Sequence, residues 1–116
     1  MNLAQFDTVC QRFPGAALAI QWGGSRVYKV GGKMFALGNR DAGVPYYVFK
    51  TTPIAYEMLL DQGLATRAPY LPRGFWVKIG DPDALPDDDL AGYFEQSYRI
   101  VAGSLPKLTR KSLGLG

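Results

Sequence analysis

A glycine pair at residues 31–32 separates two stretches rich in β-forming residues, 27–30 and 33–37. A two-residue turn between twisted antiparallel strands favours the type I′ conformation, which needs positive φ at both positions. Glycine adopts positive φ without steric cost. The sequence therefore predicts a tight β-hairpin, with Lys29 before the turn and Lys33 directly after it. A basic hairpin of this kind suits contact with an anionic partner.

The rest of the chain supplies enough further elements for one α+β domain spanning residues 1–116. Helical spacing of apolar residues and capping signals at Asn2 and Thr52-Pro53 predict helices. The expected helices cover residues 3–13, 52–63 and 86–105, and the expected strands cover 18–22, 26–30, 33–38, 46–51 and 75–79. A polar turn is expected at 39–43, a loop at 65–74 and a mobile tail at about 107–116. Short connections favour a two-layer sandwich, an antiparallel sheet of 4–5 strands with three helices packed mainly on one face.

The composition excludes the enzyme classes that depend on histidine, and no residue spacing points to catalysis by carboxylates or lysines. The chain has no histidine and a single cysteine, Cys10, so it cannot build Ser-His-Asp or Cys-His nucleophile systems. Cys10 shares an apolar helical stripe with Phe6 and Phe13, and we expect a buried, unreactive thiol. We expect no catalytic residues, no cofactor and no metal. The sequence contains neither a signal peptide nor an apolar stretch near the ~20 residues of a membrane helix, which favours a cytoplasmic bacterial protein with no membrane contact.

Charge is distributed unevenly along the chain. Of its 10 acidic residues, five lie within residues 81–89, so the remainder of the chain carries 13 basic residues against 5 acidic ones. Acids in a first helical turn stabilise the positive end of the helix dipole, whereas clustered carboxylates can also hold a divalent metal. The first explanation is favoured here because the ligand order of a calcium loop is missing. The basic remainder favours an anionic partner.

Strand parity predicts which side chains leave the core. If Phe75, Val77 and Ile79 point inward, Trp76 and Lys78 point to the opposite face of the sheet. The same parity sends Tyr46, Val48 and Lys50 to that face. Lysines that contact phosphates and rings that stack on bases would suit a nucleic acid. A homodimer or protein-binding face, and plain packing of Trp76 under the proline-rich loop, are the alternatives.

The ordered set of motifs resembles the MmcQ/YjbR family over roughly residues 5–112. It comprises Phe-Pro-Gly at 13–15, Arg-Val-Tyr-Lys-Val-Gly-Gly-Lys-Met-Phe-Ala-Leu at 26–37, a lysine-containing strand leading into a helix, Pro-Tyr at 69–70, Trp-Val at 76–77, Leu-Pro-Asp at 85–87 and Ser-Tyr at 97–98. The hairpin is the most specific of these. One segment departs from the family, which often has Asn-Lys-Arg-His-Trp where this chain has Leu-Pro-Arg-Gly-Phe-Trp at 71–76.

The resemblance implies a fold similar in outline to type III secretion chaperones. It also implies a double-wing mode of DNA binding in which hairpins act as wings. Together with strand parity, it yields a set of candidate nucleic-acid-binding residues: Arg26, Lys29, Lys33, Lys50, Arg73, Trp76 and Lys78. A non-enzymatic DNA-binding protein is the leading hypothesis, and a chaperone-like protein-interaction module, dimeric through its sheet face, is the alternative.

Overall fold

The computed structural model describes residues 1–115. Two tight turns connect the three central strands of its sheet. Gly31 and Gly32 have φ values of +58° and +80° and join β2 (Ser25–Val30) to β3 (Lys33–Asp41), which confirms the predicted hairpin. Ala42 and Gly43 make a second turn with φ values of +50° and +81° and lead into β4 (Val44–Lys50). Strand β3 therefore continues into the segment 39–43, which we expected to be a turn.

The sheet has six strands in the order β1-β2-β3-β4-β6-β5, and every neighbouring pair is antiparallel. The remaining strands are β1 (Ala17–Gln21), β5 (Thr66–Arg67) and β6 (Trp76–Ile79). The expected number of 4–5 strands was too low because β5 has only two residues. Its extended state comes from pairing with β6, a contact that local sequence does not encode.

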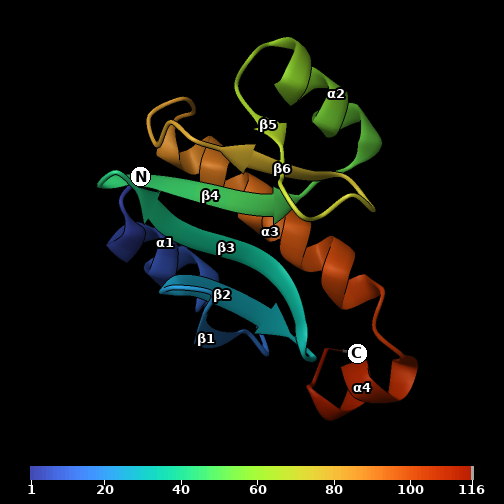
Figure 1. Cartoon of the computed structure of the whole chain (residues 1–116). Coiled ribbons are helices and arrows are strands. Elements are labelled where there is room, and N and C mark those ends of the chain that lie inside the picture. Colours follow the sequence, from blue (N-terminus) through green and yellow to red (C-terminus); the bar gives the residue numbers. More distant parts are fainter. Residues whose placement is uncertain (116) are drawn as a thin grey trace.

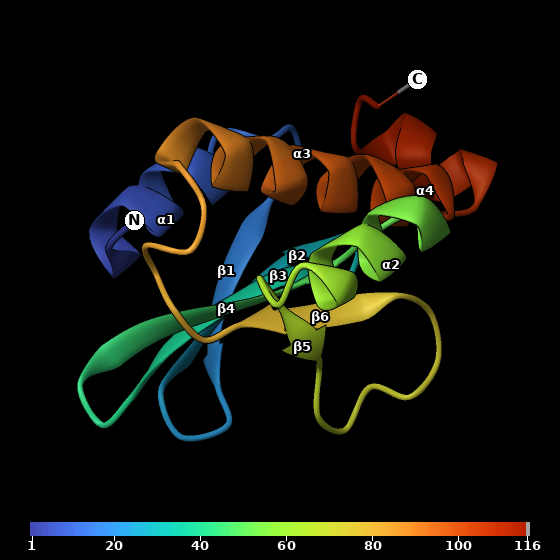
Figure 2. The ribbon, with the colours of Figure 1, turned by 90° about the horizontal axis from the view of Figure 1, so that it is seen from above.

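Four helices form the second layer, and Figures 1 and 2 show that they lie on one side of the sheet. They are α1 (Leu3–Cys10), α2 (Pro53–Asp61), α3 (Asp87–Gly103) and α4 (Lys107–Ser112). The caps are those predicted, since Asn2 accepts a hydrogen bond from the Gln5 backbone and Thr52 accepts one from that of Ala55. None of the helices within residues 1–115 has the length and apolar character needed to cross a membrane.

Helix α4 corrects the expected number of helices, and it lies within the segment at about 107–116 that we expected to be a mobile tail. Pro106 stands at the N-cap with extended backbone angles, and the chain then turns into a helix through Ser112. Beyond it, Leu113 and Leu115 pack against the main core. The segment is therefore docked on the domain through Leu115, and residue 116 lies outside the described residues.

The main core lies between the sheet and helices α1 and α3, and it is rich in aromatic rings. Phe6 of α1 contacts Tyr28 of β2 and Phe94 of α3, with ring centroids 5.4 Å and 5.1 Å apart. Val77 and Ile79 point into this core as predicted. Phe75 does not, because β6 begins only at Trp76, and 40% of the Phe75 surface remains exposed.

Candidate nucleic-acid interface

The face of the sheet turned away from the helices, which we term the open face, carries its own apolar cluster. Side chains alternate between faces along a strand, so the neighbours of core residues in β2, β3, β4 and β6 point to this side. The buried members of the cluster are Val27, Leu37, Val48 and Ala68, and Met34, Tyr46, Leu71 and Trp76 pack against them. Since Ala68 and Leu71 belong to the β5–β6 connection, that loop covers part of the open face.

Three lysines lie on the open face. Lys78 places its Nζ 4.3 Å from the ring centroid of Tyr46, and Lys50 places its Nζ 5.8 Å from that of Trp76. Lys29 pairs across strands with Met34, a member of the open-face cluster. An ammonium group held over an aromatic ring is attracted by the negative ring face. The positions that strand parity predicted for Lys50, Trp76 and Lys78 are therefore confirmed.

The segment around Arg73 folds against Lys50 and Trp76. Gly74 has φ of +81°, and a Cβ atom there would lie 3.3 Å from Lys50 Nζ and 3.5 Å from the Trp76 ring. Trp76 is consequently only half exposed, packed under the loop that precedes it. This corresponds to the packing alternative for Trp76, and it leaves little of that ring free for stacking.

Arg26 does not join the other candidate residues. Its Nε lies 2.8 Å from Asp7 Oδ1 on α1, and the same carboxylate oxygen accepts a 2.8 Å hydrogen bond from the Tyr28 hydroxyl. The hydrogen bond to Asp7 raises the pKa of Arg26. Arg26 thus connects β2 to α1 on the helical side of the sheet, away from the open face.

The tip of the β2–β3 hairpin is anchored. A Cβ atom on Gly31 would lie 2.7 Å from Leu105 Cδ1, so glycine allows the turn to pack directly against the segment that follows α3. Lys33 is exposed at the start of β3. Lys33 pairs across the hairpin with Val30 of the main core, so it lies at the end of the hairpin and not among the lysines of the open face.

Two exposed aromatic residues absent from the predicted set border an apolar hollow of the open face. Trp22, in the β1–β2 turn, is 67% exposed, and Tyr70, in the β5–β6 loop, is 98% exposed. Both line a cavity of about 460 Å³ whose other lining residues include Met34, Leu37, Tyr46, Val48, Leu71 and Lys78. Figure 2 shows both loops extending on the side of the sheet opposite α3. A signal was available in the sequence, since an aromatic residue directly precedes a Gly-Gly pair at 22–24 and follows proline at 70.

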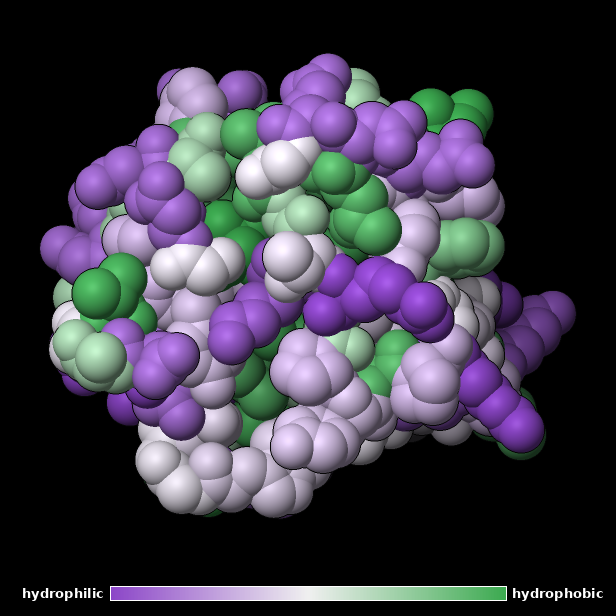
Figure 3. Space-filling view, turned by 45° about the horizontal axis from the view of Figure 1, so that its top comes forward, coloured by the Kyte–Doolittle hydropathy of each residue, from purple (hydrophilic) through white to green (hydrophobic). Residues whose placement is uncertain are grey.

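The surface is not uniformly apolar. In Figure 3, hydrophobic atoms are visible in separate patches, and hydrophilic residues surround them. Exposed apolar floors bordered by charge are typical of binding surfaces. The open face therefore combines an apolar floor, aromatic residues at its border and lysines.

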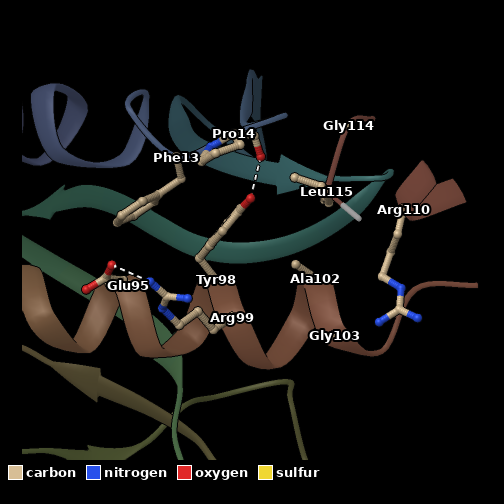
Figure 4. A pocket seen from close by; sticks show the side chains of 10 residues that line it. All are labelled: Phe13, Pro14, Glu95, Tyr98, Arg99, Ala102, Gly103, Arg110, Gly114 and Leu115. Carbon is tan, nitrogen blue, oxygen red and sulfur yellow. Dashed lines mark hydrogen bonds and ion pairs between the residues drawn. The ribbon is translucent and has the colours of Figure 1, made fainter. Parts of the chain in front are cut away.

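A second cavity, of about 430 Å³, lies on the helical side between the end of α1, α3 and the chain after α4 (Figure 4). The Tyr98 hydroxyl donates a hydrogen bond to the carbonyl of Pro14 at its edge. Arg99 pairs with Glu95 at 3.0 Å, and Figure 4 shows Arg110 well apart from Arg99. Because the two guanidinium groups do not converge, this cavity lacks the geometry of an anion site.

The acidic segment at 81–89 leads into the start of α3. Asp87, Asp88 and Asp89 occupy its first turn, where carboxylates stabilise the positive end of the helix. Among the described residues, no three Asp, Glu or Cys side chains are close enough together to hold a metal ion. Cys10 is fully buried. Burial raises the pKa of its thiol, and the negative charge of the nearby Asp7 carboxylate raises it further.

The sequence of this domain matches a known protein family. The family model described as YjbR matches residues 11–100, which is most of the chain. The chain belongs to the YjbR family. This confirms the resemblance, whereas a comparison with curated proteins finds no match.

Two solved structures share the fold of this YjbR chain. DR2400 of Deinococcus radiodurans, described as a DUF419 domain, superposes with a TM-score of 0.86 at 22% identity, covering 99% of this chain and 89% of its own. A structural genomics target from Pseudomonas syringae superposes with a TM-score of 0.69 at 19% identity, covering 87% of this chain and 99% of its own. At such identities the likeness establishes the α+β fold alone.

Proposed function

We propose that this YjbR-family protein binds nucleic acid through the open face and the β2–β3 hairpin, and that it catalyses no reaction. The observation that carries the proposal is the presence of Lys29, Lys50 and Lys78 on one face of the sheet, with Lys33 at the adjoining hairpin. Phosphate contacts by lysine supply most of the affinity of sequence-independent binding to nucleic acid.

The distribution of opposite charge supports the same surface. The acidic first turn of α3 belongs to the helical layer, on the other side of the sheet from the open face (Figure 2). A polyanion approaching the protein is therefore repelled by the start of α3 and attracted to the lysines of the open face. We also propose a cytoplasmic location in a bacterial cell, which the lack of any internal disulfide supports, because small secreted domains are commonly stabilised by disulfides.

The test is a titration of fluorescently labelled DNA of mixed sequence at several salt concentrations. The logarithm of the binding constant should fall linearly with the logarithm of salt concentration, with a slope of about 0.9 per phosphate contact on duplex DNA and about 0.7 on a single strand. The double variant Lys29→Gln/Lys33→Gln should lower that slope by up to about 2. The matched control is Lys107→Gln/Lys111→Gln on α4, which removes the same charge from the helical layer. If both variants weaken binding equally, net charge explains the affinity and the proposed surface is wrong.

A second candidate function is a chaperone-like protein interaction or homodimer through the same open face. The apolar cavity between Trp22 and Tyr70 favours it, because exposed apolar hollows also serve protein partners. Sedimentation of the protein at high concentration distinguishes the two. A dimer that Trp22→Ala converts to a monomer, together with no salt-dependent DNA binding, would support this second candidate instead.

A further inference from the structure

Trp22 and Tyr70 share a left-handed backbone conformation that is uncommon for bulky residues. Among residues 1–115, the only non-glycine residues with positive φ are Trp22 at +48°, Ala42 at +50° and Tyr70 at +66°. Ala42 and Trp22 both lie in tight hairpin turns, since Asp41 pairs with Val44 and Gln21 pairs with Ser25. For a bulky side chain, the left-handed region costs free energy, and such residues cluster at binding sites.

Neither aromatic ring recovers that cost by burial. Trp22 and Tyr70 are both mostly exposed and contribute little to either apolar cluster. Trp22 is nevertheless followed by Gly23 and Gly24, residues that adopt positive φ freely. The exposed ring of Trp22 is therefore free to make a contact outside the domain.

Partly buried hydrogen bonds hold the Trp22 turn in place. The Ser25 hydroxyl donates to the Trp22 carbonyl at 3.3 Å and accepts from Asn39 Nδ2 on β3 at 3.0 Å. Ser25 is itself buried. On the opposite side, the Ala68 backbone N–H donates to the Trp76 carbonyl at 3.1 Å and closes the base of the loop that carries Tyr70. The two rings are therefore presented from two supported loops on either side of one cavity.

The residues that line the cavity determine which class of ligand it can bind. Its floor, formed by side chains such as Leu37, Val48 and Leu71, offers no charge to a ligand and suits a flat apolar surface. Lys78 lies in the cavity wall, and Lys29 flanks it beside Met34. A planar ring joined to an anionic group satisfies both features, and that is the composition of a nucleotide.

We propose that this cavity takes one unpaired base of a single-stranded nucleic acid, stacked against Trp22 and Tyr70, with Lys78 and Lys29 at the flanking phosphates. The inference rests on the proposed function and adds the state of the strand that is bound. Bases in a duplex are stacked inside and cannot enter a cavity of the protein surface without being flipped out. Aromatic side chains that stack on bases, beside a basic path for the backbone, are typical of single-strand recognition.

The experiment compares three labelled ligands by fluorescence anisotropy: a single-stranded oligodeoxynucleotide of mixed sequence, its duplex, and a single strand of the same length built from abasic units. The base-bearing single strand should bind more tightly than both others. Trp22→Ala and Tyr70→Ala should each weaken it by roughly 5- to 150-fold, the range for one base stacked on one ring. Both variants should leave binding of the abasic strand unchanged and should retain the thermal unfolding midpoint, since the rings are exposed.

Tryptophan fluorescence supplies an independent readout with a matched control. Titration with the base-bearing strand should quench the emission of the protein. Trp22→Phe should abolish the quenching yet keep most of the affinity, whereas Trp76→Phe, at the half-buried tryptophan, should preserve the quenching. Equal, salt-dependent binding of the base-bearing and abasic strands would overturn this inference and leave the proposed function intact, and so would a preference for duplex. Failure to bind any of the three ligands would overturn the proposed function itself.

Discussion

The hydroxyl of Ser97 on α3 accepts a 2.9 Å hydrogen bond from the backbone N–H of Lys50 on β4. The same hydroxyl donates a 2.6 Å hydrogen bond to the carbonyl of Phe35 on β3. These two strands stop pairing with each other at Ala36 and Phe49, so their next backbone groups need other partners. A fully buried serine from the helix thus completes the hydrogen bonding of the sheet directly behind the open-face lysine Lys50.

The first prediction concerns this bridge. Ser97→Ala leaves two backbone groups without a partner, and an unsatisfied buried polar group costs roughly 1–3 kcal/mol. The free energy of unfolding in urea should fall by about that amount. Ser112→Ala is the control, because Ser112 is exposed and its hydroxyl bonds only the carbonyl of Thr109 in its own helix. Equal losses in the two variants would show that the bridge adds no stability.

The second prediction separates the two glycines of the β2–β3 turn. Alanine at either position is strained by positive φ, at about 1–2 kcal/mol. Only Gly31→Ala would also collide with Leu105, since a Cβ atom on Gly32 would have open space. Urea unfolding should therefore show a larger loss for Gly31→Ala than for Gly32→Ala. Adding Leu105→Ala should then cost less in the Gly31→Ala background than in the native chain, whereas purely additive losses would exclude the collision.

The third prediction tests the reassignment of Arg26. Arg26→Gln removes a partly buried ion pair with Asp7 and should lower stability by about 1 kcal/mol. It should leave the salt dependence of DNA binding unchanged, because the residue lies on the helical side of the sheet. Lys29→Gln is the counterpart and should do the reverse, reducing the salt slope with little change in stability. A reduced slope in Arg26→Gln would return this arginine to the binding surface.

The fourth prediction concerns alkaline pH. Burial raises the pKa of Tyr47 from its ordinary value of 10 to about 12, and burial also raises the pKa of Tyr28. The folded state therefore favours the neutral phenol, so this contribution to stability is complete below pH 10 and is lost as pH rises toward 12. The urea midpoint should decline across that range. Tyr47→Phe should be less stable at neutral pH, because it loses a 2.6 Å hydrogen bond to the Met1 carbonyl, and its decline should be shallower.

The fifth prediction concerns Cys10. Its thiol is fully enclosed and its pKa is raised, so thiolate is scarce and inaccessible. A thiol-reactive dye should label the protein slowly under native conditions and at once in concentrated denaturant. Rapid labelling of the folded protein would contradict the packing of α1 against the sheet.

Features encoded by neighbouring residues were predictable from the sequence. The Gly31–Gly32 turn and the helix caps at Asn2 and Thr52 depend on the backbone preferences of a few adjacent residues, and each occurs as predicted. Strand parity likewise placed Lys50 and Lys78 on the open face. These predictions succeed because the physical cause lies within a few positions of the chain.

Features that depend on distant contacts were not predictable. The two-residue strand β5 exists only through its partner β6. Arg26 was grouped with the basic residues of the hairpin, but the fold pairs it with Asp7 of α1, which is 19 positions away in the sequence. Trp22 continues the alternation of Leu18 and Ile20 and was expected to lie in a strand, but the chain turns one residue earlier and holds it in a left-handed conformation.

Strand β1 forms one edge of the sheet, and its sequence Ala-Leu-Ala-Ile-Gln contains neither a charged residue nor proline. Leu18 and Ile20 are 43% and 57% exposed there. Natural proteins usually place lysine or proline on such an edge, because its free backbone groups can pair with an extended segment of another molecule. The β1 edge therefore leaves backbone groups open to pairing with an extended segment of another molecule, and charged or proline side chains do not block it.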